Sequence, residues 1–239
     1  MSAWTKLAVA APRIGRAERV VLPTSSIPDN YDRLDVIRDL RKAVEEELNR
    51  MPLRDGWQIL DFGCGSGYFS SHFHQRRCDV LGLDIDSRLI QKARILYPFI
   101  TFEIGDAASL SSGSYDLVFI NMVICNMGRH HYVAEAFRHF WRCLKPEGML
   151  FMTSIDLCNE IVSNANVIHS LVGEYYEGAP MMVQLRENDG TYTQPWRNYI
   201  WTKDQIERFL SAARFAVLQS EYLNSADPYY YCLAEKRRR

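Results

Sequence analysis

The feature that most constrains the fold is a short apolar run that leads directly into closely spaced glycines. Residues 57–62 are mostly apolar, and Gly63, Gly65 and Gly67 follow them at alternate positions. Glycine permits a tight turn and lets a ligand approach bare backbone. The next segment, residues 68–75, has the pattern of a helix. A strand, a glycine turn and a helix in this order predict a nucleotide-type binding site.

Strand-like and helix-like segments alternate on both sides of this turn. An apolar stripe of helical spacing predicts a helix within residues 29–50. Further strands are expected at residues 79–84, 100–104, 115–121 and 149–155, and further helices at residues 87–97, where Ser87 is a plausible N-cap, and 131–144. This alternation predicts an α/β fold with a doubly wound, mostly parallel sheet of the Rossmann-like kind.

The C-terminal part predicts one more helix and two more strands. Thr202 and Gln205 have the spacing of a capping box, which predicts a helix that ends at Ala213. Residues 215–223 and 229–234 then predict an antiparallel hairpin at the edge of the sheet. With these two strands the expected sheet has seven.

The chain of 239 residues fits one α/β domain better than two independent domains. Residues 1–28 contain three prolines and predict an irregular N-terminal arm, and residues 29–239 predict a single domain. Residues 156–200 interrupt the alternation and are rich in aromatic side chains. We expect them to form an insertion that covers the substrate.

Composition argues against several classes of function. There are 28 Lys and Arg against 29 Asp and Glu, a net charge of −1, so a nucleic-acid partner is not expected. No apolar run approaches the ~20 residues of a membrane span. The six cysteines have no metal-ligand or disulfide spacing, so we expect no metal site and reduced thiols in a cytoplasmic protein. A monomer or a homodimer fits these properties.

Two acidic residues indicate which ligand the glycine turn binds. Asp84 ends the second strand, where a carboxylate can accept hydrogen bonds from ribose hydroxyls. A dinucleotide site would favour a third glycine at position 68, but this residue is Tyr68. Asp61 precedes the turn, and its charge would repel a pyrophosphate. The same charge favours the ammonium and sulfonium groups of S-adenosylmethionine.

At this point the chain resembles the class I S-adenosylmethionine-dependent methyltransferase family. The resemblance covers residues ~57–155 well and 200–235 loosely. It rests on the segments Ile59-Leu60-Asp61-Phe62-Gly63-Cys64-Gly65-Ser66-Gly67, Val80-Leu81-Gly82-Leu83-Asp84-Ile85-Asp86, Gly105-Asp106-Ala107, Tyr115-Asp116-Leu117-Val118 and Leu144-Lys145-Pro146-Glu147-Gly148. The family transfers a methyl group from S-adenosylmethionine and releases S-adenosylhomocysteine.

The resemblance implies a role for each matching residue. The turn from Gly63 through Gly65 to Gly67 would contact the methionine part of the cofactor, and Asp61 would hold its ammonium group. Asp84 would hold the ribose. The adenine would contact Ile85, Asp106 and the backbone of Ala107, while Asn121 and Met122 would close the pocket and Tyr31 would cover the cofactor. Arg33 could pair with the methionine carboxylate or lie on the surface.

Structural roles are the alternative for the same acidic residues. Asp61 could cap the following helix, and Asp84 and Asp106 could be ordinary loop acids. Ile85 at a strand end could be part of the core. For Asp86 and Asp116 (the remaining acids of these motifs) we expect only structural roles, as caps or turn residues.

Residues on the acceptor side are expected at the carboxyl ends of the strands. Asn126, Arg129, His130 and His131 follow the fourth strand, and the two histidines are candidates for a general base. A loop or helix-cap role is the alternative for each. Relatives often carry His where this chain has Asn126, so a base of the family's kind at this position is in doubt.

The aromatic side chains of the insertion are candidate acceptor contacts. Tyr175, Trp196, Tyr199 and Trp201 could form an apolar or cation-binding wall. The alternative is that they pack the insertion against the sheet. Arg197 could bind an acidic substrate or lie on the surface, and His169 falls in a segment that we expect to be helical and structural.

The sequence therefore predicts methyl transfer to a small-molecule acceptor at an oxygen, nitrogen or activated carbon atom. Aligning the acceptor, the methyl group and the sulfur supplies much of the rate of such a displacement. Three alternatives remain: an RNA or protein methyltransferase, a nicotinamide-dependent oxidoreductase and a non-catalytic partner subunit.

Overall fold

The fold is described by a computed structural model over residues 33–156, 167–171, 178–199, 201–223 and 229–237. Its main body is a seven-stranded sheet in the order β3-β2-β1-β4-β5-β10-β9. β10 is antiparallel to β5 and to β9, while the other pairs are parallel. The strands are β1 (Gln58–Phe62), β2 (Asp79–Asp84), β3 (Thr101–Ile104), β4 (Tyr115–Asn121), β5 (Leu144–Ile155), β9 (Phe215–Tyr222) and β10 (Tyr229–Lys236). The predicted fold class is confirmed.

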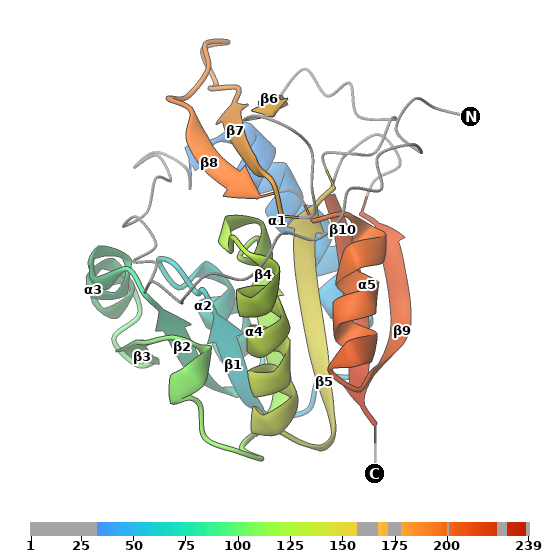
Figure 1. The fold of residues 1–239 in the computed structure, drawn as a ribbon. Helices are drawn as coiled ribbons and strands as arrows, with labels where there is room; N and C mark the ends of the chain where they lie inside the picture. Colours follow the sequence, from blue (N-terminus) through green and yellow to red (C-terminus); the bar gives the residue numbers. More distant parts are fainter. Residues whose placement is uncertain (1–32, 157–166, 172–177, 200, 224–228, 238–239) are drawn as a thin grey trace.

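Five helices flank the sheet in the described part of the chain. Figure 1 shows α4 and α5 in front of the sheet and α1 behind it. Two short 3-10 turns follow β3 and β4 and are labelled η3 and η4. The bounds are α1 (Asp35–Arg50), α2 (Tyr68–Gln75), α3 (Ser87–Leu96), η3 (Ala107–Ser109), η4 (Ile124–Asn126), α4 (His130–Cys143) and α5 (Lys203–Ala212).

Strand alternation divides the core into two main clusters, one on each face of the sheet. On β1, Ile59 packs in the cluster with α1 and α2, whereas Leu60 packs in the cluster with α4 and α5. Phe119 and Ile120 divide in the same way on β4. Because helices cover both faces, the central strands are apolar on both sides.

The element boundaries differ in detail from the sequence expectations. Asp86, rather than Ser87, caps α3, since its side chain accepts a hydrogen bond from the Arg88 backbone N–H. α4 begins one residue earlier than expected, at His130, and β5 begins at Leu144. The capping box of α5 is confirmed.

The insertion contains a second sheet that sequence reasoning did not predict. Three antiparallel strands lie in the order β6 (Val167–Leu171), β7 (Pro180–Leu185) and β8 (Trp196–Tyr199). The expected helix around His169 is wrong, because this residue lies in β6. Buried side chains of β7 and β8 join the cluster that contains α1. The small sheet therefore packs against α1.

The ends of the insertion meet at Asp156. This buried carboxylate follows β5 and accepts hydrogen bonds from the Lys203 backbone N–H at 3.1 Å and from the Tyr222 hydroxyl at 3.2 Å. Residues 156 and 203 therefore lie side by side at the carboxyl end of β5. No helix in the described part of the chain is long and apolar enough to cross a membrane.

Candidate functional site

The glycine turn is tied to the end of the neighbouring strand β2. The backbone N–H groups of Gly63 and Cys64 donate to the Leu83 carbonyl at 2.7 and 3.1 Å. The Gly65 N–H donates to Asp84 Oδ2 at 2.9 Å. These bonds hold the turn at the carboxyl edge of the parallel strands, where doubly wound sheets bind their ligands.

Two glycines are required here for different reasons. Gly63 has φ of +72°, and a Cβ atom on it would lie 2.2 Å from Cγ2 of Val123. Gly65 has φ of +54°, and a Cβ on it would have no atom within 4 Å. The turn therefore packs closely at Gly63 and borders open space at Gly65, which leaves room for a ligand against the backbone.

Asp61 is a buried carboxylate directly below the turn. It is 2% exposed, and its Oδ2 accepts a hydrogen bond from the Ser70 hydroxyl at 2.6 Å. Burial, with a smaller contribution from the charge of Asp84, raises the pKa of Asp61 to about 7. Gly67 is the N-cap residue of α2, but the Asp61 carboxylate also accepts a hydrogen bond from the backbone N–H of Ser70 in the first turn of this helix, which agrees with the alternative role as a cap. The geometry leaves a buried acid that a bound cation would stabilise.

Asp84 faces the same turn from the end of β2. Its Oδ1 accepts from the Asp86 N–H at 2.9 Å, in addition to the bond from Gly65. Burial raises the pKa of Asp84 as well. Within the described residues, neither Asp61 nor Asp84 forms an ion pair. The two acids give this part of the site a negative character.

The neighbouring candidates for an adenine site lie at the ends of β2 and β3. Ile85 is 52% exposed, so the alternative that it belongs to the core is wrong. Ala107 is buried in η3, and Asp106 caps this turn by accepting from the Ala108 N–H at 2.9 Å. Asp106 is therefore a loop acid in the structure, and its Oδ1 atom accepts the capping hydrogen bond.

The segment after β4 has a strained backbone that side chains hold in place. Met122 has φ of +57°, which is unusual for a residue with a side chain. Its carbonyl accepts a hydrogen bond from the Asn126 amide at 2.9 Å. Asn121 accepts from the Thr153 hydroxyl at 2.7 Å. The Asn126 side chain therefore holds the loop after β4 in this conformation.

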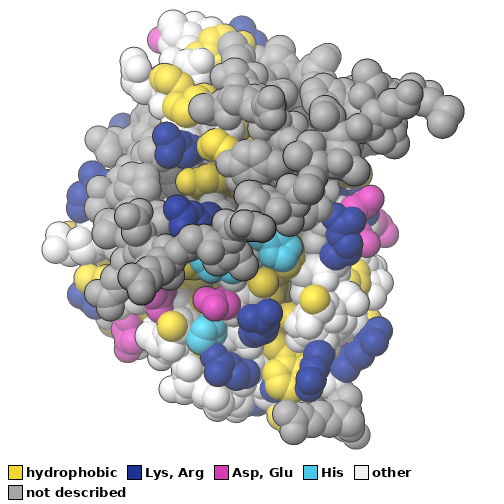
Figure 2. Space-filling view, in the orientation of Figure 1, with side chains coloured by type: hydrophobic (Ala, Val, Ile, Leu, Met, Phe, Trp, Pro, Cys, Tyr) yellow, Lys and Arg dark blue, Asp and Glu magenta, His cyan; other side chains and the backbone are white. Residues whose placement is uncertain are grey.

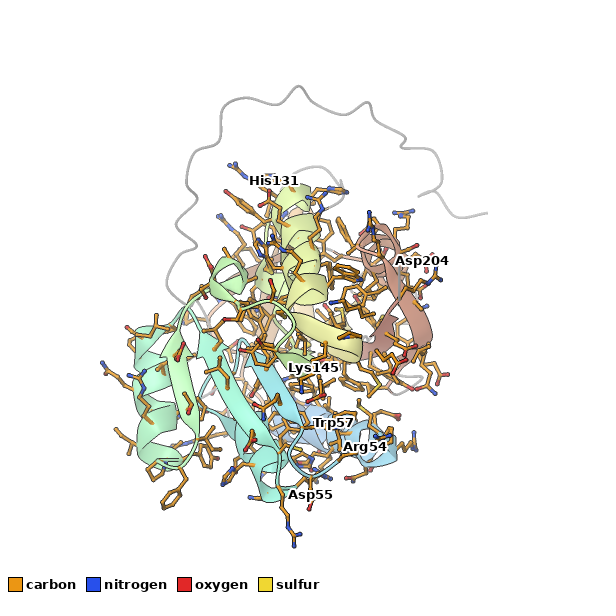
Figure 3. The ribbon with its side chains drawn as sticks, turned by 90° about the horizontal axis from the view of Figure 1, so that it is seen from below. Arg54, Asp55, Trp57, His131, Lys145 and Asp204 are labelled. Carbon is orange, nitrogen blue, oxygen red and sulfur yellow. The ribbon has the colours of Figure 1, made fainter. Side chains whose placement is uncertain are left out.

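Both candidate histidines lie on the surface at the start of α4. The ring of His130 lies 4.6 Å from the ring of Phe209, and the ring of His131 lies 4.1 Å from that of Tyr132. Figure 3 shows His131 at the outer side of α4. Arg129 is exposed and has φ of +69°. These contacts pack both histidine rings against neighbouring aromatic side chains.

The insertion brings its aromatic side chains to the loop after β4. Trp201 is 1% exposed and donates its indole N–H to the Met127 carbonyl at 2.9 Å, and Trp196 is 5% exposed. Their burial favours the packing alternative for these two tryptophans. Tyr199 is half-buried, and its ring lies against Gly128, so it can still face a ligand. Tyr31 and Tyr175 lie outside the described residues.

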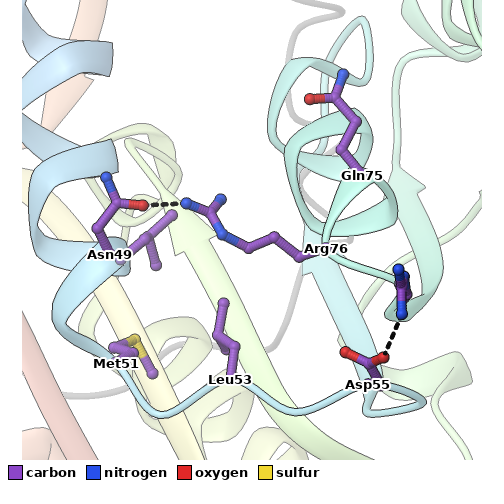
Figure 4. A pocket seen from close by; sticks show the side chains of 8 residues that line it. Asn49, Met51, Leu53, Asp55, Gln75 and Arg76 are labelled. Atoms are coloured by element: carbon purple, nitrogen blue, oxygen red, sulfur yellow. Dashed lines mark hydrogen bonds and ion pairs between the residues drawn. The ribbon is translucent and has the colours of Figure 1, made fainter.

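Two cavities in the described part of the chain lie away from the glycine turn. One, of about 320 Å³, lies where α1 and α2 end, near Asn49, Asp55 and Arg76 (Figure 4). The other, of about 580 Å³, lies between α4 and α5 beside Arg138, Arg142 and Arg214; Figure 2 shows Lys and Arg side chains over this face. Both lie away from the buried acids, so the chemistry of the turn, rather than cavity size, identifies the candidate site.

Sequence reasoning missed two residues that support the site. Ser70 bonds to Asp61, and its place one turn into α2, facing the sheet, was a signal that could have found it. Asn198 of β8 is buried and donates to the Cys125 carbonyl at 3.1 Å and to Asn126 Oδ1 at 3.3 Å. No sequence signal places Asn198 there, because the pairing depends on how the insertion folds back.

Comparison with known proteins agrees with this geometry. Residues 60–152 match a family model described as a methyltransferase domain. The chain is 28% identical over 119 residues to malonyl-[acyl-carrier protein] O-methyltransferase of Enterobacter lignolyticus, covering 48% of this chain and 45% of that protein. It is 33% identical over 127 residues to trans-aconitate 2-methyltransferase of Deinococcus radiodurans, covering 52% of this chain and 46% of that protein. Over residues 60–152 the chain is therefore similar to class I S-adenosylmethionine-dependent methyltransferases.

The likeness in structure extends further than the likeness in sequence. The PH0226 protein of Pyrococcus horikoshii has a TM-score of 0.69 and 21% identity, covering 86% of this chain and 94% of that one. This match shows that the two proteins share a fold over most of this chain. The chain spans about half the length of the curated relatives that it matches. S-adenosylmethionine is the cofactor of this family.

Proposed function

We propose that the protein transfers the methyl group of S-adenosylmethionine to a small-molecule acceptor and releases S-adenosylhomocysteine. The observation that carries this proposal is the buried Asp61 carboxylate beside the glycine turn. A buried acid with a raised pKa and no ion-pair partner among the described residues favours a ligand that supplies positive charge. The cofactor's ammonium group does so, and its sulfonium adds to the attraction.

The other candidate residues fit the remaining parts of the cofactor. The turn between Gly63 and Gly67 borders open space that would take the methionine part. Asp84 would accept from the ribose hydroxyls, and the exposed Ile85 would pack on the adenine. Asp106 and the Ala107 backbone would contact the adenine edge, and Asn121 and Met122 would close the pocket.

We propose a carboxylate oxygen as the acceptor atom. The malonyl and trans-aconitate substrates in the names of two relatives are carboxylic acids or their derivatives. A carboxylate is already ionised at neutral pH, so its methylation needs no general base. This chemistry agrees with a site in which His130 and His131 are exposed on α4. In-line alignment would then supply most of the catalysis.

The first test is a calorimetric titration of the protein with S-adenosylhomocysteine. We expect micromolar binding, and folded protein that binds neither this product nor S-adenosylmethionine would refute the proposal. The second test measures release of S-adenosylhomocysteine with trans-aconitate, a phenol, an amine or RNA as acceptor. Methylation of trans-aconitate supports a carboxylate oxygen as the acceptor atom. Methylation of only the phenol, only the amine or only the RNA would replace it with an acceptor atom of that class.

A further inference from the structure

The hydrogen bond between Ser70 and Asp61 is the most enclosed polar contact near the turn. Ser70 is 0% exposed and Asp61 is 2% exposed, and their oxygens lie 2.6 Å apart. Ser70 is the third residue of α2, the helix that the glycine turn begins. The pair therefore links the end of β1 to the first turn of α2, across the base of the candidate cofactor site.

The surroundings of Asp61 make its two hydrogen bonds from Ser70, one from the hydroxyl and one from the backbone N–H, important. Asp84 is a second acid close enough to raise the pKa of Asp61, and the Cys64 thiol beside them is itself held neutral by burial. No Lys, Arg or His in the described part of the chain forms an ion pair with Asp61. In a buried setting of low polarity, a hydroxyl donor fixes a carboxylate in orientation and favours its charged form.

We propose that Ser70 is a positioning residue, which holds the Asp61 carboxylate in place for the ammonium group of the cofactor. The Ser70 hydroxyl donates to Oδ2, and together with the bond from the Ser70 backbone N–H it restricts the orientation of the carboxylate, which keeps lone pairs for a ligand. This inference rests on the proposed function. Ser70 acts through Asp61 and has no direct contact with the ligand in this scheme.

The test compares Ser70→Ala with Ser71→Ala by calorimetric titration. Ser71 is the next residue on α2, is half-buried and accepts a hydrogen bond from Gln75, so its variant controls for the loss of a hydroxyl on this helix. At pH 7 we expect S-adenosylhomocysteine to bind about tenfold more weakly to Ser70→Ala, and within twofold of the natural protein to Ser71→Ala.

A second ligand separates positioning from a general effect on folding. 5′-Methylthioadenosine has the adenosine and the sulfur but no ammonium group, so its affinity should be unchanged in Ser70→Ala. An equal loss for both ligands, or no loss for either, overturns the proposal. If the natural protein binds neither ligand, the proposed function fails instead.

The dependence on pH gives a further readout that a purely structural role would not produce. The loss of affinity for S-adenosylhomocysteine in Ser70→Ala should exceed tenfold at pH 6. It should be smaller at pH 8.5, where Asp61 ionises without the Ser70 hydroxyl. A loss that is the same at both pH values contradicts the proposal. If Ser70→Ala does not fold, Ser70→Cys keeps a weak donor of similar size and should weaken S-adenosylhomocysteine severalfold while sparing 5′-methylthioadenosine.

Discussion

Gly63 is the residue at which backbone conformation and packing act together. Replacing it with alanine places a Cβ 2.2 Å from Val123 on a backbone with φ of +72°. We expect Gly63→Ala to lower the free energy of unfolding by about 2–4 kcal/mol, since both strain and overpacking oppose it. Urea denaturation measures this change.

Gly56→Ala is the matched control for Gly63. It has a similar φ of +76°, but a Cβ there meets no atom within 4 Å, so only strain of about 1 kcal/mol is expected. Adding Val123→Ala to Gly63→Ala should recover part of the loss. Equal effects of the two glycine substitutions would show that packing at Gly63 is unimportant.

Asp61 should make the stability of the ligand-free protein depend on pH. Its pKa is about 7 in the fold against an ordinary 3.8, so the folded protein keeps this proton to higher pH than the unfolded chain does. The stabilisation that results from this raised pKa is fully present below about pH 4 and is lost as the pH rises through 7. Replacing Asp61 with asparagine removes the titration and leaves an acceptor for Ser70.

The measurement is urea denaturation of the natural protein and Asp61→Asn at pH 5 and pH 8. From pH 5 to pH 8, the free energy of unfolding of the natural protein should fall by about 2–3 kcal/mol more than that of the variant. Asp84 titrates in both proteins, so its contribution largely cancels. If the free energies of unfolding of the two proteins changed equally with pH, burial would not raise the pKa of Asp61.

At the scale of elements, β8 holds the loop that follows β4. Asn198 donates to the Cys125 carbonyl and to Asn126, and its removal leaves a buried carbonyl with one donor fewer. We expect Asn198→Ala to lower the free energy of unfolding by about 1–3 kcal/mol. Arg197→Ala, one residue earlier on the exposed side of β8, should change it by less than about 0.5 kcal/mol. Equal values for the two variants in urea denaturation would contradict this role for Asn198.

Local sequence patterns predicted the elements of the main sheet well. α2, β2 and β4 begin and end at the predicted residues, because the apolar patterns that mark them are local in sequence. The sheet of the insertion could not be predicted in this way. Its strands pair across long separations and pack on α1, so the contacts that stabilise them are not local in sequence.

The residues of the candidate site also differ in whether local sequence patterns could predict them. Asp61, Asp84 and the glycines could be found because a motif fixes their spacing around one turn. Trp201 was one candidate for an acceptor contact, and its burial favours the packing alternative. Contacts between the insertion and the loop after β4 depend on tertiary structure, and a sequence alone does not give them.

At the scale of the whole molecule, cofactor binding should stabilise the fold. S-adenosylhomocysteine at 100 times its Kd should raise the free energy of unfolding by about 2.7 kcal/mol. For a chain of this size the Tm should then rise by about 5–10 °C. Thermal denaturation followed by circular dichroism measures the shift, and NAD at the same concentration is the control. A larger shift with NAD would favour the oxidoreductase alternative.

The bond between Asp156 and the Lys203 backbone has a consequence for how such a protein can diversify. Because the end of β5 and the start of α5 meet at this bond, the stretch between these residues can change in length and content without shifting the strand register of the main sheet. Gene duplication followed by exchange of this stretch could present a new surface to a new acceptor while the methyl-donor machinery stays intact. The same junction marks where chimeric enzymes of this fold are best joined.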